Sequence, residues 1–119
     1  FHLPAVSMSW QTPITDNDMF QAEIVDTMGY LQVIDCHQPW CGPCKAMQST
    51  FKRIYFDYGD KPLKFYTADV TQLEALADLK EASCKPNFVF YQDGEKVETV
   101  AGVDAPNVVR IIYDKLGIS

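Results

Sequence analysis

The chain has 119 residues, of which 47% are hydrophobic and 22% charged, so we expect one globular domain over residues 1–119 with a single core. Ten lysines and arginines stand against sixteen acidic residues, and the resulting net charge of -6 is opposite to the basic surface that binds nucleic acid or anionic lipid. No apolar stretch approaches the roughly 18 to 20 residues that cross a bilayer. These properties exclude the usual nucleic-acid and membrane classes and leave proteins as the expected partners.

The first part of the chain alternates between strand and helix patterns. Residues 6–10 alternate between apolar side chains and serine, which predicts a short strand with one buried face. Capping acids and apolar side chains at every fourth position predict a helix over 15–28, with Met28 on its buried stripe and Gly29 as its stop. Residues 30–36 are short and largely apolar, which predicts a strand covered on both faces. We therefore expect a strand-helix-strand start.

The middle of the chain continues this alternation. Apolar side chains share one stripe from Cys41 to residue 58, which predicts a helix that the cysteine region opens. A strand is predicted over 63–69. Thr71 and Glu74 have the spacing of a capping box, in which each side chain bonds the other's backbone, so a third helix is expected here.

The end of the chain predicts a hairpin and a last helix. Apolar residues 88–91 lead into Asp93-Gly94, a dipeptide that favours a tight turn, and the charged run 95–101 suits an edge strand. Asp104 then caps a helix that reaches Leu116. The whole order predicts an α/β fold of three layers, in which four helices flank a central mixed sheet.

One short motif between a buried strand and a helix carries the chemistry. Its sequence is Trp40-Cys41-Gly42-Pro43-Cys44. At a helix start the free N–H groups and the helix dipole favour a thiolate on Cys41, which makes it the candidate nucleophile. Pro43 suits the first helical turn, and Cys44, one turn on, would resolve a mixed disulfide. The alternatives are an inert disulfide or half of a zinc site, although only two histidines are present and zinc is disfavoured.

Asp35 and Pro86 are further candidate site residues. Asp35 ends a strand that otherwise consists of core residues, and a buried carboxylate without a cation is a plausible proton acceptor for Cys44. The alternative is a partly solvated aspartate bonded to backbone. Pro86 precedes an apolar strand, where it either carries a cis peptide facing the sulfurs or starts the strand as an ordinary trans proline.

Two cysteines and a histidine lie outside the motif. We expect Cys36 to pack as a small apolar side chain in the core. Cys84 lies in a polar loop beside Lys85, which favours its thiolate, so it is a candidate regulatory thiol open to glutathionylation or an intermolecular bridge. His37 is expected to be an exposed loop residue and not a ligand.

Several features of the sequence together resemble the thioredoxin family. They are the strand that ends at Asp35, the Trp-Cys-Gly-Pro-Cys-Lys sequence, Pro86 before a strand, and Gly94 and Gly102 on either side of the strand after it. The resemblance covers nearly the whole chain. It implies that Cys41 is the attacking thiolate, Cys44 the resolving thiol and Asp35 the buried acid, with Trp40, Gly42 and Pro43 supporting the site and Pro86 in cis beside it. It also implies that no cofactor is bound, and that a reductase outside the chain reopens a Cys41–Cys44 disulfide.

The sequence departs from ordinary thioredoxins near the motif. Cys36-His37-Gln38-Pro39 replaces the usual aromatic and small pair, and Lys85 and Asn87 flank the proline in place of an apolar residue and threonine. Thr67 occupies the strand position where many thioredoxins carry a charged partner for the buried acid. These differences predict an altered substrate groove and a different setting for Asp35.

Residues 33–48, Cys84-Lys85-Pro86 and the segment 102–106 are similar to one branch of the family, the thioredoxin-type light chains of outer-arm dynein and the thioredoxin domains fused to nucleoside diphosphate kinase. This similarity implies a cytoplasmic protein of the ciliary or flagellar axoneme whose partners are disulfide substrates and dynein heavy or intermediate chains. The expected function is therefore thiol–disulfide exchange by a redox-sensitive light chain. The alternatives are a free cytosolic thioredoxin that reduces general protein disulfides and a purely structural dynein subunit.

Overall fold

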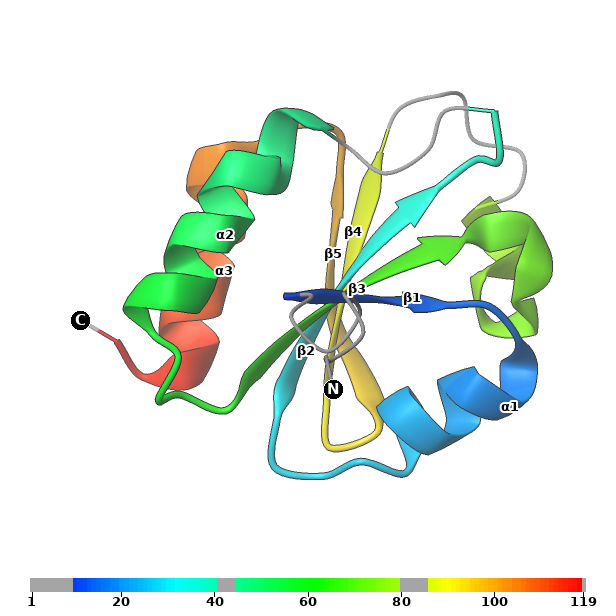
Figure 1. Cartoon of the computed structure of the whole chain (residues 1–119), viewed down its shortest axis with the longest axis horizontal. Coiled ribbons are helices and arrows are strands. Elements are labelled where there is room, and N and C mark those ends of the chain that lie inside the picture. Colours follow the sequence, from blue (N-terminus) through cyan, green and yellow to red (C-terminus); the bar gives the residue numbers. More distant parts are fainter. Residues whose placement is uncertain (1–9, 41–44, 80–85, 119) are drawn as a thin grey trace, which may run out of the picture.

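The computed structural model describes residues 10–40, 45–79 and 86–118. Its centre is a five-stranded sheet in the order β1-β3-β2-β4-β5. β1 and β2 run parallel to β3, whereas β4 is antiparallel to both β2 and β5. Figure 1 shows α2 and α3 on one face of this sheet and α1 on the other. The strands are β1 (Gln11–Ile14), β2 (Leu31–His37), β3 (Leu63–Asp69), β4 (Asn87–Gln92) and β5 (Glu95–Ala101).

Four helical segments cover the sheet, as the sequence predicts. The first combines α1 (Asn17–Phe20) with a π-helical turn over Gln21–Val25, and the second combines a 3₁₀ turn over Lys45–Met47 with α2 (Gln48–Asp57). The third consists of 3₁₀ turns over Val70–Gln72 and Glu74–Leu79, and the fourth is α3 (Ala105–Leu116). The predicted mixed sheet flanked by four helices is therefore confirmed.

Two apolar clusters hold the three layers together, one on each face of the sheet. Side chains alternate between the faces of a strand, so Leu31 and Val33 of β2 face α2 and α3, whereas Ile34 and Cys36 face α1. Phe51 of α2 is fully buried in the first cluster, with its ring 5.0 Å from that of Phe65. Apolar packing thus covers each face of the sheet.

The strand predicted at the start of the chain is tested only at its last residue. Most of the strand predicted over 6–10 lies outside the described residues, and Trp10, which is described, precedes the first strand. β1 instead contains Pro13, which the edge of a sheet tolerates because one side of the strand needs no backbone donor. Trp10 packs by its ring against Phe65, 5.5 Å away between centroids. Aromatic packing holds Trp10 here without strand pairing.

The first helix is shorter than predicted. Asp16 caps it as expected, since its Oδ1 accepts a hydrogen bond of 2.8 Å from Met19 N. The helix ends in a π-helical turn at Val25, and Met28, predicted on the buried stripe, is 58% exposed. The wider turn rotates the following residues off the 3.6-residue stripe on which the prediction relied.

The predicted capping box at Thr71 and Glu74 is wrong. Both the backbone N and Oγ1 of Thr71 donate to Asp69 Oδ1, at 2.9 and 2.6 Å. The backbone N of Glu74 donates instead to Asn17 Oδ1, 2.9 Å away and far along the chain. Because a distant side chain supplies the acceptor, this segment forms two 3₁₀ turns in place of the expected helix.

The hairpin and the last helix form as predicted. Asp93 and Gly94 both have positive φ, 54° and 81°, which is the backbone of a tight two-residue turn between β4 and β5. A β-carbon on Gly94 would lie 2.7 Å from Val25 O, so this position also excludes any side chain. Asp104 Oδ1 caps α3 by accepting a hydrogen bond from Asn107 N.

Candidate functional site

At one end of the sheet, β2 and β5 end and β4 begins. β2 ends at His37, and the register places Cys36 opposite Asn87 of β4 and Asn87 opposite Ala101 of β5. Pro86, which directly precedes β4, therefore lies at the same end of the sheet as the residues that follow β2. The backbone N of Gly102 donates to Pro86 O at 2.7 Å, which ties the end of β5 to this proline.

The predicted redox motif begins at this end of the sheet. Trp40, its first residue, is 69% exposed. Cys41, Gly42, Pro43 and Cys44 lie outside the described residues. The chain is described again from the 3₁₀ turn at Lys45, which continues directly into α2. In chain order, the two predicted redox cysteines thus connect the end of β2 to the helical segment of α2.

Asp35 is buried on the face of the sheet that α2 and α3 cover. It is 1% exposed and shares its face of β2 with Leu31 and Val33. Thr67 of β3 and Phe88 of β4 are its neighbours across the sheet. The predicted alignment of Asp35 with Thr67 is therefore confirmed, and no charged group occupies the strand position beside this carboxyl group.

Pro86 and Cys84 differ in what the structure describes. Pro86 is half-buried and precedes the first strand residue, Asn87. Lys85 lies outside the described residues, so the predicted cis form of the Lys85–Pro86 bond falls outside them as well. The candidate regulatory thiol, Cys84, also falls outside. Their proposed roles stay predictions.

Cys36 lies on the opposite face of the sheet from Asp35. It is 1% exposed and belongs to the cluster that contains Ile34 and Val89, as the sequence predicts for a small core residue. Burial raises the pKa of its thiol far above the ordinary value, and the carboxylates of Asp35 and Asp78 add to the shift. Ionisation of the Cys36 thiol is therefore disfavoured in the folded protein.

His37 is a strand residue and not the exposed loop residue that was predicted. It is the last residue of β2, pairs with Asp69 of β3 and is half-buried. Its Nδ1 lies 3.1 Å from Gln38 O. The strand is longer than expected because its pairing with β3 continues to the end of both strands.

Gln38 is a buried polar residue to which the sequence analysis assigned no role. It is 4% exposed, and its Nε2 donates to Leu79 O at 2.9 Å. This bond joins the segment just before the motif to the end of the third helical segment, which leads toward Cys84. Gln38 thus positions two segments that flank the predicted site. No local pattern indicates it, because its partner lies 41 residues away.

We expect Gln38→Leu to lower the free energy of unfolding by about 1 to 3 kcal/mol, because Leu79 O loses a donor in a partly buried setting. Urea titration monitored by circular dichroism measures the change. Gln21→Ala is the matched control, since the Gln21 amide donates to Asp26 Oδ1 at the exposed surface and should cost less than about 0.5 kcal/mol. Equal losses in the two variants would contradict the positioning role of Gln38.

One hollow lies away from the predicted site. It has a volume of about 660 Å³ and lies at the beginning of β3, with Tyr30, Leu63 and Lys64 in its lining. Lys64 Nζ lies 4.4 Å above the ring of Tyr30. The predicted site is at the other end of these strands, so this hollow takes no part in it.

In the part of the chain that the structure describes, no helix is long and apolar enough to span a bilayer.

Comparisons with known proteins agree with this geometry. Residues 11–113 match the family model described as Thioredoxin. The chain is 46% identical over 112 residues to the dynein 14 kDa light chain of the flagellar outer arm from Chlamydomonas reinhardtii, with 92% of this chain and 84% of that protein covered. It is 43% identical over 94 residues to a thioredoxin domain-containing protein 3 homolog from Ciona intestinalis, with 79% of this chain and 14% of that protein covered.

A solved structure shows the same fold. The thioredoxin of Malassezia sympodialis superimposes with a TM-score of 0.68 at 31% identity, covering 89% of this chain and 90% of that one. This structural similarity, the family model and the similarity to the light chain lead to one conclusion. This chain belongs to the thioredoxin family.

Proposed function

We propose that the chain is a thioredoxin-type thiol–disulfide oxidoreductase. The observation that carries this proposal is the position of the Cys-Gly-Pro-Cys sequence, between the end of β2 and the helical segment that begins at Lys45. A thiolate at such a strand-to-helix junction is favoured by free backbone N–H groups and by the helix dipole. The exposed Trp40 and the nearby Pro86 support a protein substrate at this end of the sheet.

The exchange proceeds in two balanced steps. The Cys41 thiolate attacks one sulfur of a substrate disulfide, a mixed disulfide forms, and the other substrate sulfur leaves as a thiolate. Cys44 loses its proton and attacks Cys41 Sγ, which closes the Cys41–Cys44 disulfide and releases the second substrate thiolate. Two electrons have then passed from the dithiol to the substrate. An external dithiol reductase returns two electrons and one proton, which restores the Cys41 thiolate and the Cys44 thiol.

Asp35 is proposed as the acceptor of the Cys44 proton. Its burial on the α2 face, on the strand that leads into the motif, supports this role.

We further propose that the domain works as a subunit of an outer dynein arm in a ciliary or flagellar axoneme, bound to dynein heavy or intermediate chains. The similarity to the Chlamydomonas light chain supports this setting, since the alignment covers most of both proteins. The likeness to the Malassezia thioredoxin, of which the match covers 90%, supports the second candidate, a cytosolic thioredoxin that reduces general protein disulfides. Both candidates require the same dithiol chemistry.

Insulin reduction tests the chemistry. With dithiothreitol as reductant, we expect the wild-type chain to accelerate precipitation of the insulin B chain and Cys41→Ser to fall to the uncatalysed rate. Cys36→Ala is the control, because Cys36 lies on the face of the sheet opposite Asp35. This substitution should leave the activity per folded molecule unchanged. Activity that survives Cys41→Ser would refute the proposal.

Affinity capture tests the setting. A tagged Cys44→Ser chain retains its mixed disulfide, and we expect it to hold outer-arm dynein chains from an axonemal extract until dithiothreitol releases them. The matched control is Cys41→Ser/Cys44→Ser, which cannot form the trapped bond. Recovery of only soluble cytosolic proteins by Cys44→Ser would favour the free thioredoxin.

A further inference from the structure

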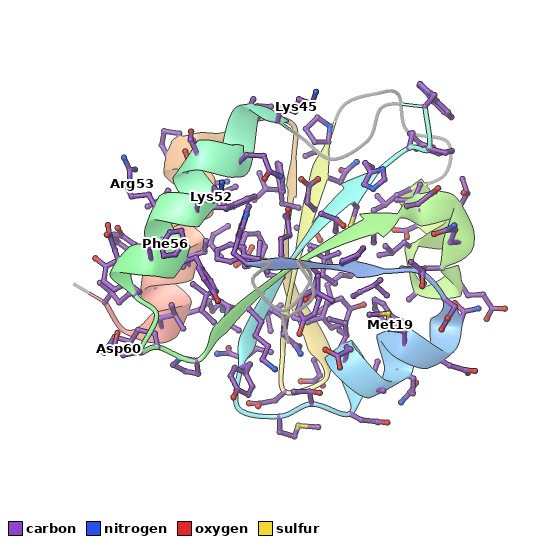
Figure 2. All side chains as sticks on the ribbon, viewed as in Figure 1. Met19, Lys45, Lys52, Arg53, Phe56 and Asp60 are labelled. Carbon is purple, nitrogen blue, oxygen red and sulfur yellow. The ribbon has the colours of Figure 1, made fainter. Side chains whose placement is uncertain are left out.

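The outward side of α2 carries positive charge on an otherwise acidic chain. Lys45, Lys52 and Arg53 are all exposed, although the whole chain has a net charge of -6. Phe56 lies one turn beyond Lys52 and Arg53 and is 72% exposed. Figure 2 shows these four side chains one after another along the helix. We call Lys52, Arg53 and Phe56, with Lys45 at the motif end, the α2 face.

The cations of the α2 face have no partner among the described residues. Neither Lys52 nor Arg53 forms an ion pair there, even though Asp57 follows Arg53 at a helical spacing that allows one. Two cations elsewhere are engaged: Arg110 Nη2 donates to Asn107 Oδ1 at 2.6 Å, and Lys64 lies over a tyrosine ring. The charges of the α2 face are therefore available to another molecule.

The charge of this helix is not explained by helix stability. A helix dipole favours acids in the first turn and bases in the last turn, but α2 has no acid in its first turn and no base in its last turn. Phe56 belongs to neither apolar cluster, and its ring forms a T-shaped pair with Tyr55 at 5.4 Å between centroids. An exposed aromatic ring beside an arginine is the residue combination that protein interfaces favour.

We propose that the α2 face docks an acidic segment of a partner protein, with carboxylates on Lys52 and Arg53 and an apolar side chain on Phe56. Charge complementarity selects this occupant, because Lys52 and Arg53 are neighbouring exposed cations on a chain whose net charge is -6. Duplex nucleic acid is a poorer fit, since three cations on an acidic chain release few counterions. One helix face makes a small interface, so binding is weak and sensitive to salt.

The docking proposal does not depend on thiol chemistry. It is tested with a labelled synthetic amphipathic peptide that carries glutamates on one side and leucines with one phenylalanine on the other. Fluorescence anisotropy measures its affinity for the chain. We expect this peptide to bind at least about tenfold more tightly than a version with glutamine in place of glutamate, because two exposed ion pairs at about 1 kcal/mol each account for that ratio.

Variants of the exposed residues complete the test. Lys52→Glu/Arg53→Glu should weaken binding at least about tenfold, and Phe56→Ala should weaken it even at high salt. Lys96→Glu, an exposed position on the edge strand β5, should change it less than about twofold, and Cys41→Ser should bind like the wild type. Equal weakening by Lys96→Glu, or no effect of the α2 changes, would overturn the proposal.

Three further measurements identify a wrong occupant. Sedimentation of the chain alone would reveal a dimer, and loss of that dimer in Lys52→Glu/Arg53→Glu would assign the α2 face to a second copy. Flotation with phosphatidylserine vesicles and titration with duplex DNA are the other two. Tighter binding of either probe than of the peptide, with the same dependence on α2, would also overturn the docking of an acidic protein segment.

Discussion

Replacing Phe51 with alanine is expected to lower the free energy of unfolding by about 3 to 5 kcal/mol. The ring of Phe51 is fully buried between α2 and the sheet, 5.0 Å from the ring of Phe65 and 5.5 Å from that of Phe88. Its removal leaves a cavity and ends two aromatic contacts on the face that also carries Asp35. Urea unfolding monitored by circular dichroism measures the loss.

Phe56 offers the matched control on the same helix. It is 72% exposed, so Phe56→Ala should change stability by no more than about 0.5 kcal/mol. Because Phe51→Ala can remove much of the stability of a small domain, Phe51→Leu extends the series, with an expected loss of about 1 to 2 kcal/mol. Similar losses for Phe51→Ala and Phe56→Ala would contradict the packing described for α2.

Native alkylation of Cys36 should be at least about a thousandfold slower than alkylation of the unfolded chain. The thiol is 1% exposed, and burial together with Asp35 and Asp78 raises its pKa, so the folded protein presents almost no thiolate there. Reaction then requires opening of the fold. The measurement uses Cys41→Ser/Cys44→Ser/Cys84→Ser, in which Cys36 is the only thiol, with iodoacetamide at pH 8 in buffer and in urea.

The same raised pKa predicts how stability changes with pH. The folded state keeps Cys36 protonated, whereas the unfolded thiol ionises above about pH 9, so stability is full below that pH and falls as the pH rises. The decline attributable to Cys36 is about 1.4 kcal/mol for each pH unit at most. Cys36→Ala should flatten it between pH 9 and about 10.5. Two results would contradict the burial of the Cys36 thiol: rapid alkylation of the folded protein, or the same dependence of stability on pH in the wild type and in Cys36→Ala.

Local sequence signals predicted several elements correctly because the atoms that form them are close in the chain. Asp104 caps the helix that begins one residue later, and Gly117 ends it with a left-handed φ of 72°. Asp93 and Gly94 form the predicted turn, and the strand predicted over 63–69 has the same bounds in the structure. Short-range hydrogen bonds and the alternation of buried residues are enough to determine these elements.

Elements that depend on distant partners were predicted wrongly. Glu74 N finds its acceptor on Asn17, so the capping box expected from Thr71 does not form. The first helix widens into a π-helical turn, after which Met28 is exposed. Gln32 on β2 donates to Glu23 O at 2.6 Å within that turn, a contact that the apolar pattern of the strand does not indicate. Tertiary hydrogen bonds outweigh weak local preferences in each case.

The amino-acid sequence by itself determined the motif, the order of strands and helices and the family, because residue spacing and capping chemistry act over a few neighbouring positions. Only the tertiary structure decided what surrounds the candidate site. Strand register placed Thr67 and Phe88 beside Asp35, and a bond across 41 residues attached Gln38 to Leu79. Such contacts depend on how the layers pack, which no short stretch of sequence encodes.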